Sequence, residues 1–405
     1  MSIEGMDTRG QTFLILQGEN QYGVLDMLMR EFQMYLERYS TYHVKRIDCT
    51  AEEGIQNMAA ELSQVPACVF CLEGIGFELK VPDGRYLMQV LTDDFQVKVV
   101  GWILDSSFYH YSRLTCMTDK MKVAFVDENE AKNAQKEYGI STAAIHHFGI
   151  ESNSRKPMKE REIDLLLSCS CQTFSQFKAE MQSMVPDPFD QSLITKTAEL
   201  MLADDALLNW EALEQALSFF QISVAGEDVE EELKIIEGWA DKYYRVRQRE
   251  QCILYLLQSG ITITVCGRGW QQFKEEFGIT DQIHILSENM PYEEVLNVMD
   301  RSKIVLNICP SYKEGIHERI CTSMLRGAVC LTDSSNYLKE NFTDGENILF
   351  FHWDSLEESL QRAAGYLGQD DRLQKIANNA YLIAKKTMTV ENFTSQVLEL
   401  MEQRK

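Results

Sequence analysis

The sequence predicts an α/β protein with two doubly wound domains, and three observations carry this prediction. Short apolar runs alternate with amphipathic helical patterns along almost the whole chain, as in parallel sheets covered by helices. The chain has 405 residues, which is more than one hydrophobic core usually holds. A polar segment without periodicity, residues 151–162, separates two stretches of the alternation and is the best candidate for a linker.

The first domain is expected over residues 1–155. It opens with the apolar run QTFLILQ, which breaks at Gly18, and a helical pattern then places Val24, Leu28 and Leu36 on one face. Further strands are predicted in HVKRIDC, PACVFCLEG, VKVVGWILD, KVAFVD and AAIHHFGI. Their alternation with polar or helical segments predicts a doubly wound sheet.

The second domain is expected over residues 156–388. Its strands are predicted in IDLLLSC, ITITVCGRG, QIHILS, KIVLNICP, AVCLTD and NILFFHW. Apolar residues at helical spacing between about residues 190 and 244 predict a helical insertion in this domain. In the last segment, residues 389–405, Phe393, Val397 and Met401 share one broad face, which is typical of a docking helix.

The composition excludes several classes of partner. A net charge of −23 and a pI near 4.8 suit neither a nucleic acid nor an anionic membrane surface. The sequence MSIEGMDTRG has no signal-peptide pattern and no apolar run is long enough for a transmembrane segment, so we expect a cytoplasmic protein. The eleven cysteines lack zinc-ligand spacing and are expected to pack as reduced thiols, with no metal site.

Charged residues gather in the segment YKEGIHERICTSMLRGAVCLTD. It reads as a loop beyond a strand's carboxyl end, a helix closed by Gly327, and a strand. Two doubly wound domains leave a cleft between the carboxyl ends of their sheets, where such folds bind ligands. The helix N-terminus and Arg319 suit a diphosphate, and Glu314 can accept hydrogen bonds from sugar hydroxyls. This combination indicates a nucleotide-sugar donor; the alternative is a capped helix with a surface ion pair.

A glycine-rich turn is predicted in VCGRGWQQF. Gly267 and Gly269 permit a close backbone approach to a ligand, and Arg268 between them can meet a diphosphate. The pattern is not specific, because glycine turns after strands are frequent. Arg247 in YYRVRQRE can also reach a diphosphate, although a place on the helix surface is the commoner role for such a cation.

VCGRGW and the segment from ILSENMPYEEVLNVM to TDGENILFF resemble the C-terminal half of group-one bacterial glycosyltransferases, in the branch of the CgeB spore-maturation proteins. GWILDSSFYHYSRL is similar to the family's N-domain motif, an Asp-His-Pro-like turn followed by an aromatic residue and a His. The resemblance implies the GT-B fold of two Rossmann-like domains, with the last helix returning to the first domain. It further implies a metal-independent glycosyltransferase without a cofactor, which moves a sugar from a nucleotide-sugar donor to a hydroxyl of a glycan, protein or small molecule.

The resemblance also implies roles for single residues. Glu314 matches the first acid of a Glu-x7-Glu element, facing the donor sugar, and Thr322 replaces the second acid, which would hold the ribose. The Thr322 hydroxyl can still bind a ribose through one neutral bond, or it simply faces the helix packing. The donor-binding candidates are Gly267, Arg268, Gly269, Asn307, Glu314, Gly315, His317, Glu318, Arg319 and Thr322.

Three residues are candidates for catalysis. Arg319 would stabilise the leaving diphosphate, and Asp105 or His110 could take a proton from the acceptor hydroxyl if the reaction inverts. Alternatively, Asp105 caps the next helix and His110 is a buried structural histidine. Two other functions stay open. Thr322 and the turn Asp105-Ser106-Ser107, which depart from the family pattern, would favour a silent GT-B-like binding or chaperone subunit. The other is a sugar-nucleotide epimerase, which acts within one bound sugar and needs no acceptor groove.

Overall fold

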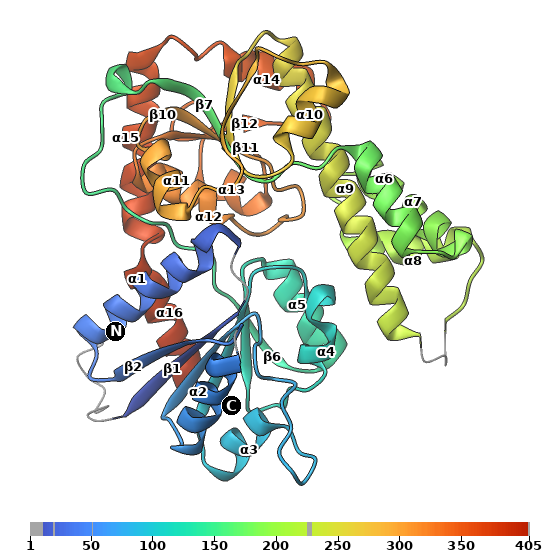
Figure 1. The fold of residues 1–405 in the computed structure, drawn as a ribbon, viewed down its shortest axis with the longest axis vertical. Coiled ribbons are helices and arrows are strands. Elements are labelled where there is room, and N and C mark those ends of the chain that lie inside the picture. The colour runs from blue at the N-terminus through green and yellow to red at the C-terminus, as the bar shows by residue number, and fades with distance from the viewer. Residues whose placement is uncertain (1–10, 19–20, 51, 225–228, 404–405) are drawn as a thin grey trace. The chain divides into compact units, whose positions relative to one another are not determined.

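The structure, a computed structural model, describes residues 11–18, 21–50, 52–224 and 229–403. The chain forms two compact units, each built on a parallel sheet of six strands (Figure 1). Unit 1 comprises residues 1–151, 314–325 and 383–405, and unit 2 comprises residues 152–313 and 326–382. The prediction of an α/β protein with two doubly wound sheets is confirmed.

The sheet of unit 1 has the strand order β2-β1-β3-β4-β5-β6. Its four inner strands are apolar and mostly buried because helices cover the sheet, whereas the edge strands β2 and β6 are more polar and partly exposed. The elements are β1 (Thr12–Gln17), α1 (Val24–Tyr39), β2 (His43–Asp48), α2 (Glu52–Ser63), β3 (Cys68–Leu72), α3 (Leu87–Asp94), β4 (Lys98–Ile103), η3 (Ser107–His110), α4 (Tyr111–Leu114), β5 (Lys122–Phe125), α5 (Glu128–Tyr138), β6 (Ser141–Ala144), α12 (Glu318–Leu325) and α16 (Val390–Glu402).

Phe393 anchors the last helix, α16, in unit 1. Its ring centroid lies 4.6 Å from that of Trp102, 4.7 Å from that of Phe148 and 5.1 Å from that of Phe32. Val397, on the same face of the helix, is completely buried. Burying each of these side chains stabilises the docking by about 1.5 to 3 kcal/mol. The apolar spacing of this segment therefore identifies a helix face that is packed in the structure.

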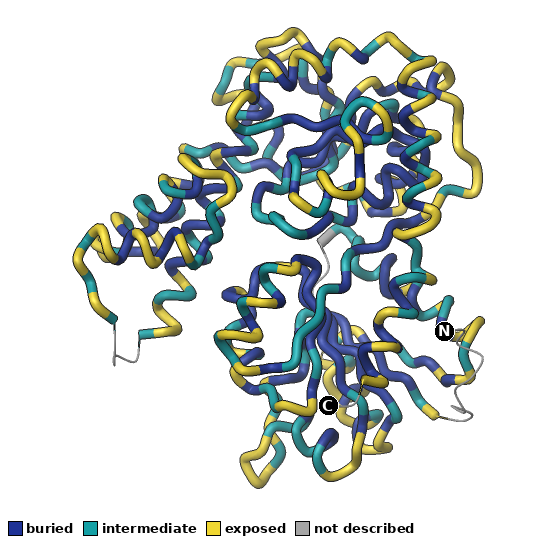
Figure 2. The backbone as a smooth tube through the Cα atoms, turned by 180° about the vertical axis from the view of Figure 1, so that it is seen from behind, coloured by how far each residue is buried: buried dark blue, intermediate teal, exposed yellow. Residues whose placement is uncertain are grey.

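The sheet of unit 2 has the strand order β12-β11-β10-β7-β8-β9. Figure 2 shows the strands of the sheets as buried, with exposed residues mainly on helices and loops. The elements are β7 (Ile163–Ser168), α6 (Phe174–Met184), α7 (Pro188–Ala203), α8 (Asn209–Phe219), α9 (Glu230–Gln258), β8 (Ile263–Cys266), α10 (Trp270–Phe277), β9 (Ile283–Ser287), α11 (Tyr292–Met299), β10 (Ser302–Asn307), β11 (Val329–Asp333), α13 (Asn336–Asn341), β12 (Leu349–Phe351), α14 (Leu356–Ala364) and α15 (Asp370–Thr387).

Helices α6 to α9 form a bundle with a hydrophobic core of its own. The inserted helices begin at Phe174 rather than near residue 190, because Thr173 and Gln176 form a capping box that starts α6. α9 continues to Gln258, and its second half packs against the core of the unit 2 sheet through Cys252 and Leu256. Among the helices of the described ranges, none has the length and apolar character needed to cross a bilayer.

Arg161 fixes the segment that the sequence suggested as a linker. The side chain is 3% exposed and donates to the backbone carbonyls of Lys156, Met299, Ser302 and Arg326 at 2.7–3.1 Å. Burial lowers the pKa of Arg161 to about 10, so the guanidinium is still charged at neutral pH. The segment before β7 is therefore tied to unit 2 by a buried cation, and polar composition alone did not indicate this.

We expect Arg161→Met to lower the free energy of unfolding by roughly 3 kcal/mol, because it leaves buried carbonyl groups without donors. Arg301→Met is the control: Arg301 pairs at 2.6 Å with Glu162 at the surface, and its loss should cost less than about 1 kcal/mol. Urea unfolding followed by circular dichroism measures both variants. Equal losses of stability would contradict the role assigned to Arg161.

Candidate functional site

The topological switch point of the unit 2 sheet lies between β7 and β10. These two strands pair in parallel, and from them the chain proceeds to β8 and β9 on one side and to β11 and β12 on the other. Doubly wound folds bind ligands outside the carboxyl ends of the strands at such a point. The loops after β7 and β10 are therefore where unit 2 is expected to bind a ligand.

Gly267 and Gly269 form the turn after β8, with φ angles of 129° and 87°. A Cβ atom on Gly267 would lie 2.3 Å from the carbonyl oxygen of Cys169, and one on Gly269 would lie 1.9 Å from that of Cys171. The Cys171 N–H donates to the Arg268 carbonyl at 2.8 Å. The glycines thus let this turn pack against the loop after β7, so the close backbone approach seen here is to the chain itself.

The other two donor candidates of unit 2 differ in exposure. Arg268 is exposed, and its Nε donates to Asn289 Oδ1 at 2.9 Å. Asn307 is 1% exposed, and its amide donates to Thr332 Oγ1 at 3.0 Å across the β10–β11 pair. The Arg268 side chain therefore lies where a ligand can reach it, whereas the Asn307 amide contributes a hydrogen bond within the sheet.

α9 holds the loop after β10. Ser311 Oγ donates to Asp241 Oδ1 at 2.6 Å, and Lys313 Nζ donates to the Tyr244 hydroxyl at 3.2 Å. Burial raises the pKa of Asp333 at the end of β11, and the Lys313 ammonium opposes that shift. Sequence reasoning missed Asp241 and Tyr244, whose only signal is polar residues at helical spacing within an otherwise apolar face.

Arg247 has a role on the surface of α9. Its Nη1 lies 3.0 Å from Glu250 Oε1, and its guanidinium carbon lies 4.9 Å from the ring centroid of Phe174. The side chain is 46% exposed. These contacts favour the helix-surface alternative for Arg247.

In unit 1, Asp127 organises the loop that carries Glu314. Asp127 Oδ2 accepts the backbone N–H of Glu314 at 2.8 Å, and Oδ1 accepts that of Asn129 in the first turn of α5. A Cβ atom on Gly315 would lie 2.8 Å from the carbonyl oxygen of Val126. One carboxylate therefore caps α5 and fixes the loop before α12, and Gly315 permits the close approach.

The start of α12 is capped within unit 1. His317 Nδ1 accepts the backbone N–H of Arg319 at 3.1 Å. The Thr322 hydroxyl donates to the Glu318 carboxylate and accepts the backbone N–H of Ile150 at 3.1 Å. Thr322 is fully buried and Glu318 is 5% exposed. This geometry favours the alternative in which Thr322 faces the helix packing.

Asp105 and His110 lie together with Glu73, and we call these three residues the acid–histidine cluster. Asp105 follows β4 and is exposed, whereas His110 is 9% exposed and its Nε2 lies 2.8 Å from Glu73 Oε2. Burial raises the pKa of Glu73, and His110 opposes that shift. Sequence reasoning missed Glu73, whose signal was an acid between the buried strand β3 and Gly74.

The acid–histidine cluster holds its geometry through strained backbone. Glu73 has a φ angle of 54°, in the left-handed region that side chains other than glycine rarely adopt. Both carboxylate oxygens of Glu73 accept the backbone N–H of Leu104, at 3.2 and 3.3 Å. One ligand atom from each cluster member lies within 4.8 Å of the others, and carboxylates and imidazole are ligand types for a divalent cation. The cluster can thus hold a cation or relay a proton.

Glu130 shapes the turn Asp105-Ser106-Ser107. Its Oε2 accepts the Ser107 backbone N–H at 2.9 Å, and the Ser106 and Ser107 side chains also bond to the carboxylate. Burial raises the pKa of Glu130 to about 7. The serines that replace the His-Pro-like part of the family turn are therefore bound to a half-buried carboxyl group.

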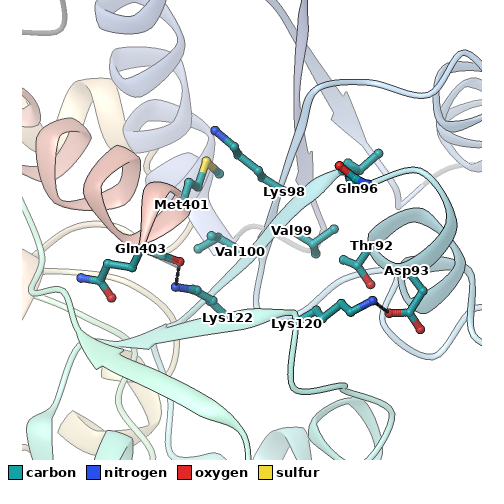
Figure 3. A pocket seen from close by; sticks show the side chains of 11 residues that line it. Thr92, Asp93, Gln96, Lys98, Val99, Val100, Lys120, Lys122, Met401 and Gln403 are labelled. Carbon is teal, nitrogen blue, oxygen red and sulfur yellow. Dashed lines mark hydrogen bonds and ion pairs between the residues drawn. The ribbon is translucent and has the colours of Figure 1, made fainter. Parts of the chain in front are cut away.

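A pocket of 390 Å³ lies at the amino-terminal ends of β4 and β5 in the unit 1 sheet (Figure 3). Three lysines line it. Lys120 Nζ lies 2.7 Å from Asp93 Oδ1, Lys122 Nζ donates to the Gln403 carbonyl at 2.6 Å, and Lys98 pairs with Glu402. Each ammonium thus has a partner in the wall or in the end of α16, which indicates packing of the terminal helix.

The raised pKa of Glu130 predicts a pH dependence of stability. Between its ordinary value of 4.5 and about 7 the folded protein binds a proton that the unfolded chain does not, so the free energy of unfolding falls as pH rises through this window. Glu130→Gln keeps the group neutral and should remove up to about 3 kcal/mol of this fall. Urea unfolding at pH 5 and pH 8 measures it, with Glu128→Gln, an exposed neighbour, as the control. The same pH dependence in both variants would contradict the assignment.

Comparison with known proteins gives a match to a family model over residues 245–399. The model describes glycosyl transferase-like proteins. Its range contains β8 to β12, the turn of Gly267 to Gly269 and the segment of Glu314 to Thr322. No curated protein matches the chain by sequence.

Solved structures match nearly the whole chain at low identity. Sucrose-phosphate synthase of Thermosynechococcus elongatus has a TM-score of 0.57 and 9% identity, with 96% of this chain and 98% of that chain covered. A glycosyltransferase of Rickettsia africae has a TM-score of 0.51 and 12% identity, with 97% and 98% covered. HepE of Anabaena, solved in complex with UDP and glucose, has a TM-score of 0.51 and 11% identity, with 97% and 100% covered.

These comparisons agree with the two parallel six-stranded sheets and with the prediction of a glycosyltransferase. The solved structures share the fold of both units. The family model matches the part of the chain from the middle of α9 to α16. The chain therefore has the GT-B fold, and its residues 245–399 match the model of glycosyl transferase-like proteins.

Proposed function

We propose that the protein transfers a sugar from a nucleotide-sugar donor to a hydroxyl of a glycan, a protein or a small molecule. The observation that carries this proposal is the family match over residues 245–399, which covers β10 and the charged segment after it. The switch point of the unit 2 sheet supports it, because polar and cationic side chains gather at the loop after β10. HepE, a structural neighbour, binds UDP and glucose.

In the proposed reaction the acceptor oxygen forms a bond to the anomeric carbon of the sugar. The bond from that carbon to the diphosphate oxygen breaks, and the nucleoside diphosphate leaves with the electron pair. We propose that no metal ion is required, because cations and backbone N–H groups can stabilise the leaving diphosphate. Arg319 and Arg268 are the proposed cations, and Gly267 and Gly269 shape the turn that carries Arg268.

For an inverting transfer, we propose that the acid–histidine cluster accepts the proton of the acceptor hydroxyl. Asp105 is exposed to solvent, and Glu73 Oε2 lies 2.8 Å from His110 Nε2, where it would stabilise an imidazolium. Glu314, His317 and Glu318 are the proposed contacts to the donor in the segment before and at the start of α12. The cellular setting that we propose is the cytoplasm of a bacterium, with a place in the CgeB-like branch.

One observation favours a second function, that of a binding subunit without transfer activity. The Thr322 hydroxyl, which replaces an acid of the family pattern, is fully buried and bonded to Ile150 and Glu318. A group so engaged offers no hydrogen bond to a ribose. Such a subunit would bind a nucleotide sugar or an acceptor and leave both unchanged.

A screen of nucleotide sugars distinguishes the proposals. We expect the protein to bind at least one nucleoside diphosphate in isothermal titration calorimetry and to hydrolyse the matching nucleotide sugar slowly, with the same rate in EDTA. Binding without hydrolysis or transfer to any acceptor favours the binding subunit, and a new nucleotide sugar as the product indicates an epimerase. Absence of binding to every common nucleoside diphosphate would contradict a donor site.

Thr322→Val tests whether the hydroxyl serves packing or the ribose. Packing predicts a loss of about 1 to 3 kcal/mol in unfolding free energy, because the buried N–H of Ile150 loses its acceptor. It also predicts a dissociation constant for UDP within twofold of that of the unmutated protein. Thr322→Ser keeps the hydroxyl and is the control. A weaker affinity for UDP without a loss of stability would assign Thr322 to the ribose.

Arg319→Ala tests the proposed diphosphate contact at the start of α12. Removal of a bidentate cation should weaken the binding of UDP by about 1.5 to 3 kcal/mol, measured by isothermal titration calorimetry. The binding of uridine, which has no phosphate, should not change. Unchanged affinity for UDP in a folded Arg319→Ala protein would count against this contact.

A further inference from the structure

Three charged residues of α9, Asp241, Arg245 and Arg249, follow one another at intervals of four. Residues at this spacing lie on one face of a helix. Asp241 is 1% exposed, and its Oδ2 lies 2.6 Å from Arg245 Nε. We call these three residues the α9 ridge.

The α9 ridge contacts both loops of the switch point. Asp241 accepts the Ser311 hydroxyl at 2.6 Å in the loop after β10. Arg249 Nη1 donates to the Ser170 carbonyl at 3.2 Å in the loop after β7. Because β7 and β10 are adjacent strands, the ridge extends along the carboxyl edge of the sheet at the point where the strand order reverses.

One hydrogen-bond donor of the Arg249 guanidinium is not used within the described part of the chain. Its Nε is buried and has no hydrogen-bond partner among the residues that the structure describes. An unpaired buried donor on a charged group is unfavourable, and such groups in folded proteins are usually satisfied by another group or a ligand. A guanidinium matches two oxygens of a phosphate in one plane. The contacts of Arg249 therefore point to an anion at this edge.

Two further cations of unit 2 lie on α9 or contact it. Arg245 is fixed by Asp241, and Lys313 reaches α9 at the Tyr244 hydroxyl, 3.2 Å away. Lys313 belongs to the loop after β10, which Asp241 of the ridge also holds through Ser311. In a chain with a net charge of −23, an anionic ligand needs a local group of cations of this kind.

We propose that Arg249 binds the diphosphate of the donor nucleotide at the β7–β10 switch point, with Arg245 and Lys313 as additional cations. The inference rests on the proposed function and names a residue of unit 2 that binds the donor in addition to Arg268. Asp241 is a positioning residue, because it fixes Arg245 and the loop after β10 at once. Arg247 lies on the other side of the helix, since two residues correspond to a rotation of about 200°.

Calorimetric titration with UDP tests the proposal on the full chain. We expect Arg249→Met to raise the dissociation constant tenfold or more and Arg249→Lys to raise it less, because Lys keeps the charge without the bidentate geometry. Arg247→Met is the matched control and should bind UDP within twofold of the unmutated protein. Uridine should bind equally to all variants, since it lacks the diphosphate.

The outcomes separate this inference from the proposed function. If the unmutated protein binds UDP and Arg249→Met binds it equally well, the role of Arg249 is overturned and the donor site stands. If the unmutated protein binds none of UDP, ADP, GDP and dTDP, both are overturned. Thermal unfolding of each variant verifies the fold, and should Arg249→Met fail to fold, the affinity of Arg249→Lys relative to Arg247→Met decides.

Discussion

In unit 2, three loops approach one another closely at the carboxyl edge of one parallel sheet, and the shape of the candidate site depends on this approach. The turn after β8 can pack against the loop after β7 only because glycines at 267 and 269 leave room for the carbonyls of Cys169 and Cys171. The loop after β10 is tied by its own N–H groups and side chains, with the Cys309 N–H donating to Asp333 at 3.0 Å. A parallel sheet collects these loops at one edge, and the helix that crosses them determines which side chains a ligand meets.

α9 is that helix, and it belongs to both the helical bundle and the layer that covers the sheet. Its first half completes the bundle with α6 to α8, and its second half packs on the sheet. A helix buried along most of its length usually carries apolar residues there, yet α9 buries Glu237, Asp241 and Gln248. Burying such groups is unfavourable unless they are paired. Asp241 is paired in this way with Ser311 and Arg245 beside the loop after β10, which is consistent with a binding surface that needs fixed polar groups.

The sequence predicted the strands well because a buried parallel strand is a short apolar run with turn residues on both sides. It predicted the docking face of α16 for the same reason, since Phe393 and Val397 repeat at helical spacing. It placed the start of the insertion too late, because the capping box at Thr173 resembles a polar loop when the partner helices are unknown.

The site was harder to predict because its members are brought together by topology. Glu73 meets His110 only through the adjacent strands β3 and β4, and nothing in the local sequence marks the pair. Arg247 and Arg249 are two residues apart and equal in chemistry, so only the helix orientation separates a surface cation from one that faces the switch point. The sequence alone shows that Thr322 departs from the family pattern. Its hydrogen bond with the Ile150 N–H could be found only from the folded structure.

A crystal structure of the full chain with UDP tests the central claim, that the donor nucleotide binds at the β7–β10 switch point of unit 2. The account predicts diphosphate oxygens within hydrogen-bonding distance of the Arg249 guanidinium and beside the loop that carries Ser311 and Lys313. A diphosphate bound elsewhere on the chain, with Arg249 still donating to the Ser170 carbonyl and not to the ligand, would contradict it.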